Sequence, residues 1–229
     1  MTQPRNKEEK RDLEKKILEF AEVIFAQKGF HEATITDIAK QAGAGEATIY
    51  NYFENKEDLL IKIPVERTRE AGDLLAEHLE GIKGSINRIR KIVWFFFHYW
   101  ETHPNFSTII QLMWRVNKKY FHLDPHDLRH KLVGYILRTI EEGQKEGFID
   151  QSINVRLCHN IMLDIMEGTL TRWLLRRSDW SLTDNAAEVA DIIIKALHAP
   201  VPHEGVLQFN IQEVNVLYGG RTTKGGKKE

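Results

Sequence analysis

Residues 34–53 decide the fold: Thr34-Ile-Thr-Asp-Ile-Ala-Lys-Gln-Ala-Gly-Ala-Gly-Glu-Ala-Thr-Ile-Tyr-Asn-Tyr-Phe53 predicts two short helices joined by a tight turn. The first helix carries apolar residues at helical spacing, namely Ile35, Ile38, Ala39 and Ala42. Thr34 can cap its start, with Asp37 in the position of a capping box. Gly43 tolerates the left-handed conformation that ends a helix. This pattern is typical of a helix-turn-helix, which lays its second helix in the major groove of DNA.

The second helix is predicted at about 46–53 and follows Gly45, a weak cap. The spacing of Ile49 and Phe53 directs both side chains to the core. The outward residues include hydroxyl and amide groups suited to phosphate oxygens and base edges: Glu46, Ala47, Thr48, Tyr50, Asn51 and Tyr52. Asn55 can cap a third helix, with Lys56 in its first turn, where it can meet a phosphate. Two helices packed in some other all-α domain are the alternative, but exposed tyrosines favour DNA contact.

Three motifs in this region form a specific combination. They are Ile17-Leu-Glu-Phe-Ala-Glu-Val-Ile-Phe-Ala-Gln-Lys-Gly-Phe30, then Ala33-Thr-Ile-Thr-Asp-Ile-Ala-Lys-Gln-Ala-Gly43, then Ala47-Thr-Ile-Tyr-Asn-Tyr-Phe53 with Lys56-Glu-Asp-Leu59. Together they resemble the TetR family of one-component repressors over residues 10–63. The resemblance implies that DNA phosphates are contacted by Thr36, Thr48, Tyr50, Tyr52 and Lys56. It also implies that base edges are read by Glu46, Ala47 and Asn51. Thr34 is a further predicted DNA-binding residue. Gly45 departs from the family pattern, which usually has serine there.

The composition describes an ordinary globular protein of 229 residues, with 42% hydrophobic and 10% aromatic residues. No apolar run is long enough to cross a membrane, and the first residues are too polar for a signal peptide. The single cysteine, Cys158, excludes an internal disulfide and lies in a helical pattern that predicts a buried thiol. We therefore expect a cytoplasmic protein with no membrane partner and no cofactor.

The charge of the predicted DNA-binding region is not basic. Residues 1–62 contain ten Lys or Arg and twelve Asp or Glu, whereas a nucleic-acid-binding domain usually carries a positive excess. Only a local patch could serve, made of Arg5, Lys7, Lys10, Arg11, Lys40 and Lys56. We expect modest non-specific affinity and a marked dependence on dimerisation.

Beyond residue 63 the pattern stays helical, which predicts an all-α protein of about nine helices. Helices are expected at about 56–80, 85–102, 105–120, 127–147, 153–177 and 182–198, and Pro64 permits a kink or short break. The expected domains are 1–55 for DNA binding, 56–199 for ligand binding and dimerisation, and 200–229 as an extension. Within the extension, residues 206–218 alternate like a strand and residues 219–229 are expected to be disordered.

An aromatic run, Trp94-Phe-Phe-Phe-His-Tyr-Trp100, predicts a helix that is buried on most sides. Plain core packing and the wall of a ligand pocket are both compatible with it. The pocket would be lined by Trp94, Phe97, His98, Phe106, Ile110, Met113 and Trp114.

Charge is unevenly spread over this second half. Residues 83–138 carry ten Lys or Arg against three Asp or Glu, and residues 139–198 carry six against ten. Solvated helix faces are one explanation. The other is a basic mouth that binds the anionic head of a long apolar ligand. The candidate residues are Arg88, Arg90, Lys91, Arg115, Lys118 and Lys119.

Segments 140–150 and 164–173 also resemble the ligand-binding half of the TetR family. The resemblance implies that the last two long helices, 153–177 and 182–198, form a homodimer interface. Segment 173–180 is similar to the acyl-CoA-responsive FadR branch. The resulting prediction is a homodimeric repressor that a small molecule, such as a fatty acyl-CoA, releases from operator DNA. The alternatives are a repressor that senses many cationic compounds and a helical ligand-binding protein without DNA activity.

Metal and enzyme chemistry find little support in the sequence. His122, His126 and His130 are four residues apart, as metal ligands on one helix can be, but Pro125 interrupts that helix and no carboxylate or cysteine completes a set. Gly43-Ala-Gly45 lacks the strand that a dinucleotide loop follows, and no phosphate-binding loop or nucleophile motif is found. We expect neither a metal site nor an enzyme.

Overall fold

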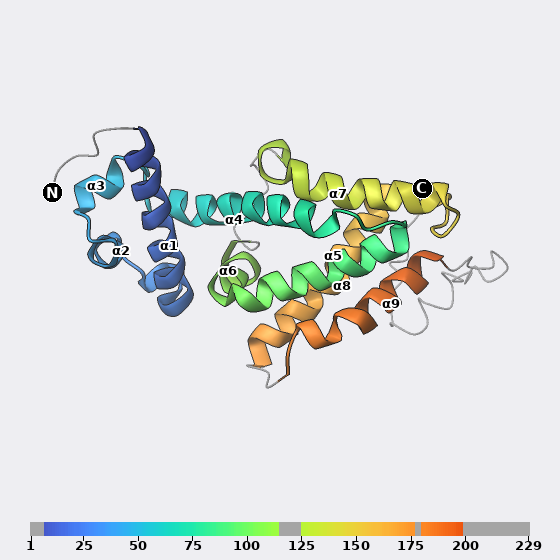
Figure 1. The fold of residues 1–229 in the computed structure, drawn as a ribbon. Coiled ribbons are helices and arrows are strands. Elements are labelled where there is room, and N and C mark those ends of the chain that lie inside the picture. Colours follow the sequence, from blue (N-terminus) through green and yellow to red (C-terminus); the bar gives the residue numbers. More distant parts are fainter. Residues whose placement is uncertain (1–6, 115–124, 177–179, 199–229) are drawn as a thin grey trace, which may run out of the picture. The chain divides into compact units, whose positions relative to one another are not determined.

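The structure is a computed structural model that describes residues 7–114, 125–176 and 180–198, and every regular element in these ranges is helical (Figure 1). The α-helices are α1 (Lys7–Glu32), α2 (Ile35–Ala42), α3 (Glu46–Tyr50), α4 (Lys56–Leu79), α5 (Ser85–Thr102), α6 (Pro104–Thr108), α7 (Pro125–Lys145), α8 (Val155–Arg176) and α9 (Ala186–His198). A π-helical segment, η1 (Ile109–Trp114), continues α6, and a short 3-10 turn, η3 (Thr183–Asn185), precedes α9. The all-α prediction is confirmed.

Local signals set the ends of the first helices as the sequence predicts. The Thr34 hydroxyl accepts a hydrogen bond from the Asp37 amide at 3.1 Å, and the Asp37 carboxylate accepts one from the Thr34 amide at 3.1 Å. Gly43 ends α2 in the left-handed conformation, with φ 65°. Gly45 caps α3 without a side-chain hydrogen bond, and the Asn55 side chain caps α4 by accepting from the Asp58 amide at 2.9 Å. The helix-turn-helix is therefore built by residues next to one another in the chain.

Two hydrophobic cores organise the helices. The N-terminal core consists of the buried apolar residues between positions 17 and 63 together with Ile109. The C-terminal core consists of the other buried apolar residues between positions 71 and 197, and α5 lies within it in contact with α4, α6, α7, α8 and α9. Helix α4 contributes to both cores, with Leu59, Leu60 and Ile63 in the first and Leu75 and Leu79 in the second. A domain boundary after residue 55 therefore remains a prediction.

The helix expected at about 56–80 is present as α4, whereas the helix expected at 105–120 differs from the prediction. Helix α4 runs through Pro64 without a break, because apolar residues on both sides of the proline are held in a core. The helix expected at 105–120 is a short α-helix followed by a π-helical segment up to Trp114. Residues 115–120, the expected strand at 206–218 and the extension from residue 200 lie outside the described ranges.

Two carboxylates from distant parts of the chain hold helix starts in the C-terminal core. Glu101 of α5 accepts hydrogen bonds from the Leu182 amide at 3.1 Å and the Thr183 amide at 3.1 Å, at the entry to α9. Glu146, just after α7, accepts from the Ser85 amide at 3.0 Å, at the start of α5. These contacts satisfy backbone amides at the start of α5 and at the start of η3, the turn that leads into α9, as Thr34 does at the start of α2.

Candidate DNA interface and ligand-binding region

The outward face of α3 is open to solvent. Glu46, Ala47, Tyr50 and Asn51 are exposed, and Tyr50 keeps 53% of its surface accessible. The opposite face is anchored by Ile49, which is fully buried in the N-terminal core. An exposed tyrosine ring on a rigidly anchored short helix presents both an apolar face and a hydroxyl donor to a partner.

The first turn of α3 is tied to α2 by side chains from the predicted DNA-binding set. The Thr36 hydroxyl donates to Glu46 at 2.6 Å, and both residues are exposed. Next to them, Asp37 pairs with Lys28 at 2.8 Å and accepts from Thr34 at 2.8 Å. Hydrogen bonds from Lys28 and Thr34 lower the pKa of Asp37 to about 2. The exposed Thr34, Thr36 and Glu46 therefore form one preorganised strip beside α3.

Two residues expected to face DNA are partly engaged within the protein. The Lys56 ammonium donates to the carbonyl oxygens of Ala33 at 2.7 Å and His31 at 3.3 Å, and it lies 4.6 Å from the centre of the Phe30 ring. Tyr52 is half-buried and packs against the N-terminal core. Helix α3 ends at Tyr50, three residues before the predicted end, so Tyr52 follows the helix rather than lying on its outward face. Thr48 is half-buried.

The residues expected to bind a ligand fall into different environments. Phe97 and Phe106 are buried in the C-terminal core, and Ile110 packs against that core. Met113 packs against the N-terminal core, so η1 touches both cores. The side chain of Trp114 and the predicted head-group partners Arg115, Lys118 and Lys119 are not among the residues that the structure describes.

Trp94 stands apart on the surface of α5. Its half-buried ring is stacked on the exposed His98 ring with centroids 4.9 Å apart, and the Lys91 ammonium lies 3.9 Å from the Trp94 ring. The His78 ring of α4 lies edge-on to the Trp94 ring, with the two ring centroids 5.7 Å apart. Burial, followed by the charges of Lys91 and His98, lowers the pKa of His78. The stack is a surface feature that differs from the buried wall formed by Phe97.

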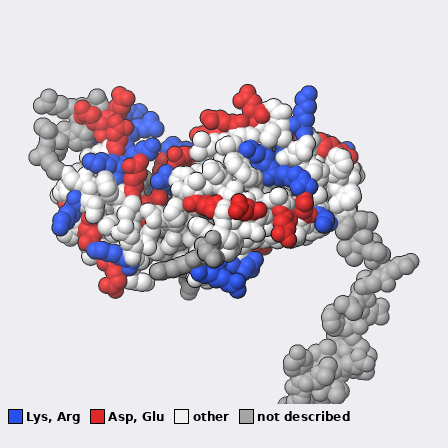
Figure 2. Space-filling model, turned by 60° about the horizontal axis from the view of Figure 1, so that its bottom comes forward, with Lys and Arg blue, Asp and Glu red and all other residues white. Residues whose placement is uncertain are grey.

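The uneven charge of the sequence is partly neutralised by pairing between helices. Arg88 of α5 pairs with Glu142 of α7 at 2.8 Å, and Arg90 of α5 pairs with Asp191 of α9. Each pair joins the basic block at 83–138 to the acidic block at 139–198. In Figure 2 positive and negative side chains are interspersed over the visible face. The excess of arginine and lysine therefore reflects helix packing as well as any ligand.

Arg88 also lines a cavity of about 400 Å³ between α4, α5 and α7. The other lining residues are Ala76, Glu77, Leu79, Glu80, Tyr135, Arg138 and Thr139. The Arg138 guanidinium is exposed and lies 4.8 Å from the centre of the Tyr135 ring. Two arginines beside an aromatic ring suit a ligand group that is anionic and planar or apolar.

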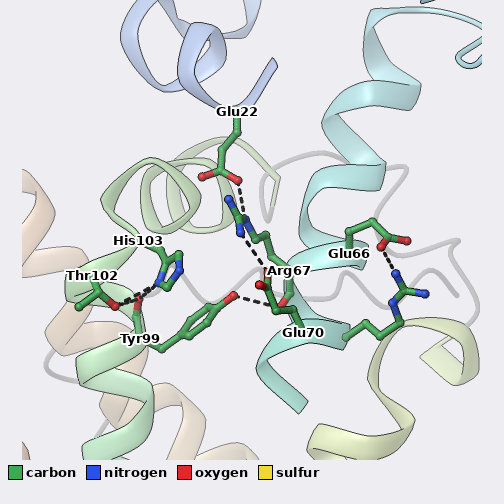
Figure 3. A network of polar contacts seen from close by, with 8 residues as sticks. Glu22, Glu66, Arg67, Glu70, Tyr99, Thr102 and His103 are labelled. Carbon is green, nitrogen blue, oxygen red and sulfur yellow. Dashed lines mark hydrogen bonds and ion pairs between the residues drawn. The ribbon is translucent and has the colours of Figure 1, made fainter. Parts of the chain in front are cut away.

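A polar network that the sequence reasoning missed joins α1, α4 and α5 (Figure 3). The Arg67 guanidinium pairs with Glu22 at 2.8 Å and Glu70 at 3.0 Å, and the Tyr99 hydroxyl donates to the Arg67 carbonyl oxygen at 3.2 Å. Burial alone would lower the pKa of Arg67, but the two carboxylates outweigh it and raise that pKa. One sequence signal existed: Glu22 lies four residues after Leu18, on the apolar face of its helix.

Large apolar side chains are exposed on the helices expected to form a dimer. They are Leu157 and Leu175 on α8 and Ile192 on α9. Cys158 beside them is fully buried, as predicted, and burial raises the pKa of its thiol. None of the described helices combines the length and apolar character needed to cross a membrane. Within the same ranges no three candidate metal ligands come together, and the side chains of His122, His126 and His130 lie outside them.

A helix-turn-helix with an exposed second helix, joined by one long helix to a second helical core, is an arrangement typical of DNA-binding transcriptional regulators. The sequence profile described as bacterial regulatory proteins of the tetR family matches residues 17–63. The profile described as the C-terminal region of YsiA-like protein matches residues 66–196. The chain therefore belongs to the TetR family of bacterial transcriptional regulators.

Relatives and solved structures point to the same family. The chain is 23% identical over 190 residues to the fatty acid metabolism regulator protein of Bacillus subtilis, covering 83% of this chain and 98% of the relative. The crystal structure of FadR from Bacillus subtilis with stearoyl-CoA is similar with a TM-score of 0.75 and 24% identity, over 81% of this chain and all of that one. The structure of the fatty acid degradation regulator FadR from Bacillus halodurans is similar with a TM-score of 0.71 and 24% identity, over 80% of this chain and 99% of that one.

Proposed function

We propose that this regulator is a homodimeric repressor whose hold on operator DNA is released by a long-chain fatty acyl-CoA. The similarity to the fatty acid metabolism regulator, which spans 98% of that protein, carries the proposal. The likeness to a structure that contains stearoyl-CoA supports it. The proposed role is regulatory rather than catalytic, and its place is the cytoplasm, where operator DNA is found.

The proposed DNA contacts follow from the exposed strip around α3. Glu46, Ala47 and Asn51 would read base edges, while Tyr50 and Thr36 would contact phosphates. Thr34, Thr48, Tyr52 and Lys56 complete the proposed set. Each protomer would insert one α3 into a major groove, with the two helices about 34–36 Å apart or a multiple of that spacing.

The proposed dimer uses α8 and α9. Leu157, Leu175 and Ile192 expose apolar surface on these helices, and a second copy would cover it. The proposed division of labour is DNA binding by residues 1–55, and ligand binding with dimerisation by residues 56–199. A dimer would join two weak half-site interactions into one strong interaction, which suits a DNA-binding region without positive net charge.

The proposed effector site combines the aromatic core around Phe97 and Phe106 with the cavity at Arg88, whose lining also contains Arg138, Glu77 and Glu80. The apolar chain of the ligand would enter the core, and its phosphates would pair with Arg88 and Arg138, which line the cavity of about 400 Å³. To switch a promoter, the ligand must favour the released state by several kcal/mol, up to about 5.5 for a full switch.

A thermal-shift panel with a DNA selection tests this function. The purified protein is tested against acyl-CoA thioesters of rising chain length, free fatty acids and cationic dyes, and DNA is selected from a random pool. Stabilisation that rises with CoA chain length, and recovery of a palindromic sequence, are expected. Stabilisation by dyes alone would instead support a sensor of cationic compounds. Recovery of no sequence would leave a ligand-binding protein without DNA activity.

A further inference from the structure

Arg67 lies where α4 passes from the N-terminal core to the C-terminal core, between Ile63 and Ala71. We propose that Arg67 is the positioning residue of the ligand response. The ion pair between Arg67 and Glu22 holds α1, and with it the DNA-binding region, in one position against α4. The hydrogen bond between Tyr99 and Arg67 transmits changes in the C-terminal core to this ion pair. The inference rests on the proposed function, because it concerns how a ligand changes DNA binding.

The contact with Glu22 is directional and costly to break. Glu22 of α1 is 6% exposed, and its carboxylate accepts from the Arg67 Nε at 2.8 Å. A buried carboxylate that loses its cationic partner is left as an uncompensated charge in an apolar surrounding. The apolar contacts of α1 with α4, η1 and α6 leave its exact placement open to small sliding movements, because dispersion and hydrophobic attraction have no preferred direction. The ion pair therefore selects one placement of α1 against α4.

The contact with Tyr99 reaches into the C-terminal core. Tyr99 is 4% exposed, and its ring packs against Phe95 at 5.8 Å, Phe106 at 5.8 Å and His103 at 4.2 Å. Its hydroxyl donates a hydrogen bond to the Arg67 carbonyl oxygen (Figure 3). A ligand that repacks these aromatic rings must move Tyr99, because close-packed cores change between discrete arrangements rather than deforming freely. The hydroxyl then shifts the turn of α4 that holds the ion pair.

Open space beside the pair permits this movement. A groove of about 1170 Å³ runs between α1 and α4, and Glu22 and Arg67 are among its lining residues. Much of the rest of the lining is charged, with Leu18, Ile63 and Leu74 as the apolar exceptions. Along the groove mostly charged side chains of α1 and α4 face each other across open space, while the two helices share apolar contacts in the N-terminal core.

The chain contains a matched control for this assignment. Arg69 lies two residues further along α4 and pairs with Glu66 of the same helix, and both side chains are largely exposed. This pair resembles Arg67 with Glu70 in spacing, but it contacts no other helix through any hydrogen bond or ion pair found in the described ranges. Replacing Arg69 therefore removes an arginine from α4 without removing a contact to α1, whereas replacing Arg67 removes both.

Spin-label distances within one chain test the first half of the proposal. Labels at Gln41→Cys on α2 and Glu141→Cys on α7 occupy exposed positions, and the buried Cys158 needs no replacement. Labelled protein is diluted with unlabelled protein. Arg67→Met and Glu22→Gln are expected to broaden the distance distribution about twofold, because the domain then samples several placements. Arg67→Lys should restore part of the narrow distribution, and Arg69→Met should match the wild type.

DNA affinity with and without stearoyl-CoA tests the second half. The wild-type ratio of the two affinities is expected to be about 10 or more, within the usual range of allosteric coupling. Tyr99→Phe keeps the ring and the ion pair, so the ligand-free distance distribution should be unchanged while the ratio falls toward about 1. In Arg67→Met the ratio of the two DNA affinities should also fall toward about 1, whereas in Arg69→Met it should equal the wild-type ratio.

The two halves fail separately. If the Arg67→Met distances match those of Arg69→Met, or if Tyr99→Phe keeps the wild-type ratio, the assignment of Arg67 is overturned. If the wild type itself does not respond to stearoyl-CoA, the proposed function fails together with the Tyr99 step, and the distances still decide the Glu22 contact. Should Arg67→Met not fold, Arg67→Lys and Glu22→Gln supply the same distance comparison.

Discussion

The two cores of this protein differ in how far along the chain the residues lie that hold their helix starts. In the N-terminal core the caps come from neighbours in the chain, as with Thr34 for α2 and Asn55 for α4. In the C-terminal core two helix starts are also held from far away, since Glu146 holds Ser85 and Glu101 holds the turn that leads into α9, although Asn154 caps α8 locally. The comparison shows why one half carries a recognisable sequence motif: its structure depends on short spacings, whereas the other half depends on contacts across the fold.

The largest expected effect separates the two cores. Phe53→Ala and Phe97→Ala each remove a fully buried ring, one from each core, at a cost of about 3–5 kcal/mol. Phe53→Ala should lower the unfolding temperature of the DNA-binding region first and produce a separate early transition in calorimetry. Phe97→Ala should lower the temperature of the main unfolding transition. A single transition that shifts equally in both variants would mean that the cores do not unfold separately.

The next effect compares the distant cap with the local one. Glu101→Gln keeps the shape of the side chain but weakens several charge-assisted hydrogen bonds, which should cost about 2–3 kcal/mol. Thr34→Ala should cost about 1 kcal/mol. Urea unfolding measures both. Burial opposes ionisation of Glu101, but the hydrogen bonds from Thr183 and Ser181 lower its pKa. An equal or smaller cost for Glu101→Gln would remove the contrast between local and distant caps.

A smaller effect concerns two glycines of α7. A Cβ atom at Gly143 would lie 2.6 Å from the Ile149 side chain, whereas one at Gly134 would meet only the mobile end of Arg138 at 3.3 Å. Gly143→Ala should therefore destabilise by about 1–3 kcal/mol through overpacking. Gly134→Ala should be neutral or stabilising by up to about 1 kcal/mol. Thermal unfolding of the two variants, side by side, checks the difference in sign.

The smallest effect appears only in acid and concerns Asp37 in the capping box of α2. Lys28 and Thr34 lower the pKa of Asp37 from 3.8 to about 2. Ionised Asp37 therefore stabilises the folded state above pH 3.8, and this contribution is lost as the pH falls through about 2. Urea midpoints measured between pH 5 and pH 2 should fall less steeply for Asp37→Asn than for the wild type. Identical slopes would show that the Lys28–Asp37 pair makes no such contribution.

The N-terminal core was predictable almost residue by residue. The capping box, the left-handed Gly43 and the buried Ile49 all follow from short-range pattern. The end of α3 and the engagement of Lys56 with the Ala33 carbonyl were not, because they depend on the packing of α1 against α4.

The C-terminal core was predictable in class but not in detail. The aromatic run predicted a buried helix, yet the sequence could not separate the buried Phe97 from the exposed His98 beside it. The basic block suggested a ligand mouth, although Arg88 and Arg90 also pair with acidic residues of other helices. Arg67 was missed because an arginine in an amphipathic helix is usually solvated, and only the fold brings Glu22 to it.

The most direct test of the central claim is reciprocal. Fluorescence anisotropy gives the affinity for selected DNA with and without stearoyl-CoA, and calorimetry gives the affinity for stearoyl-CoA with and without that DNA. The account predicts that each partner weakens the other by the same factor, about 10-fold or more. Tight binding of stearoyl-CoA that leaves DNA affinity unchanged would contradict it.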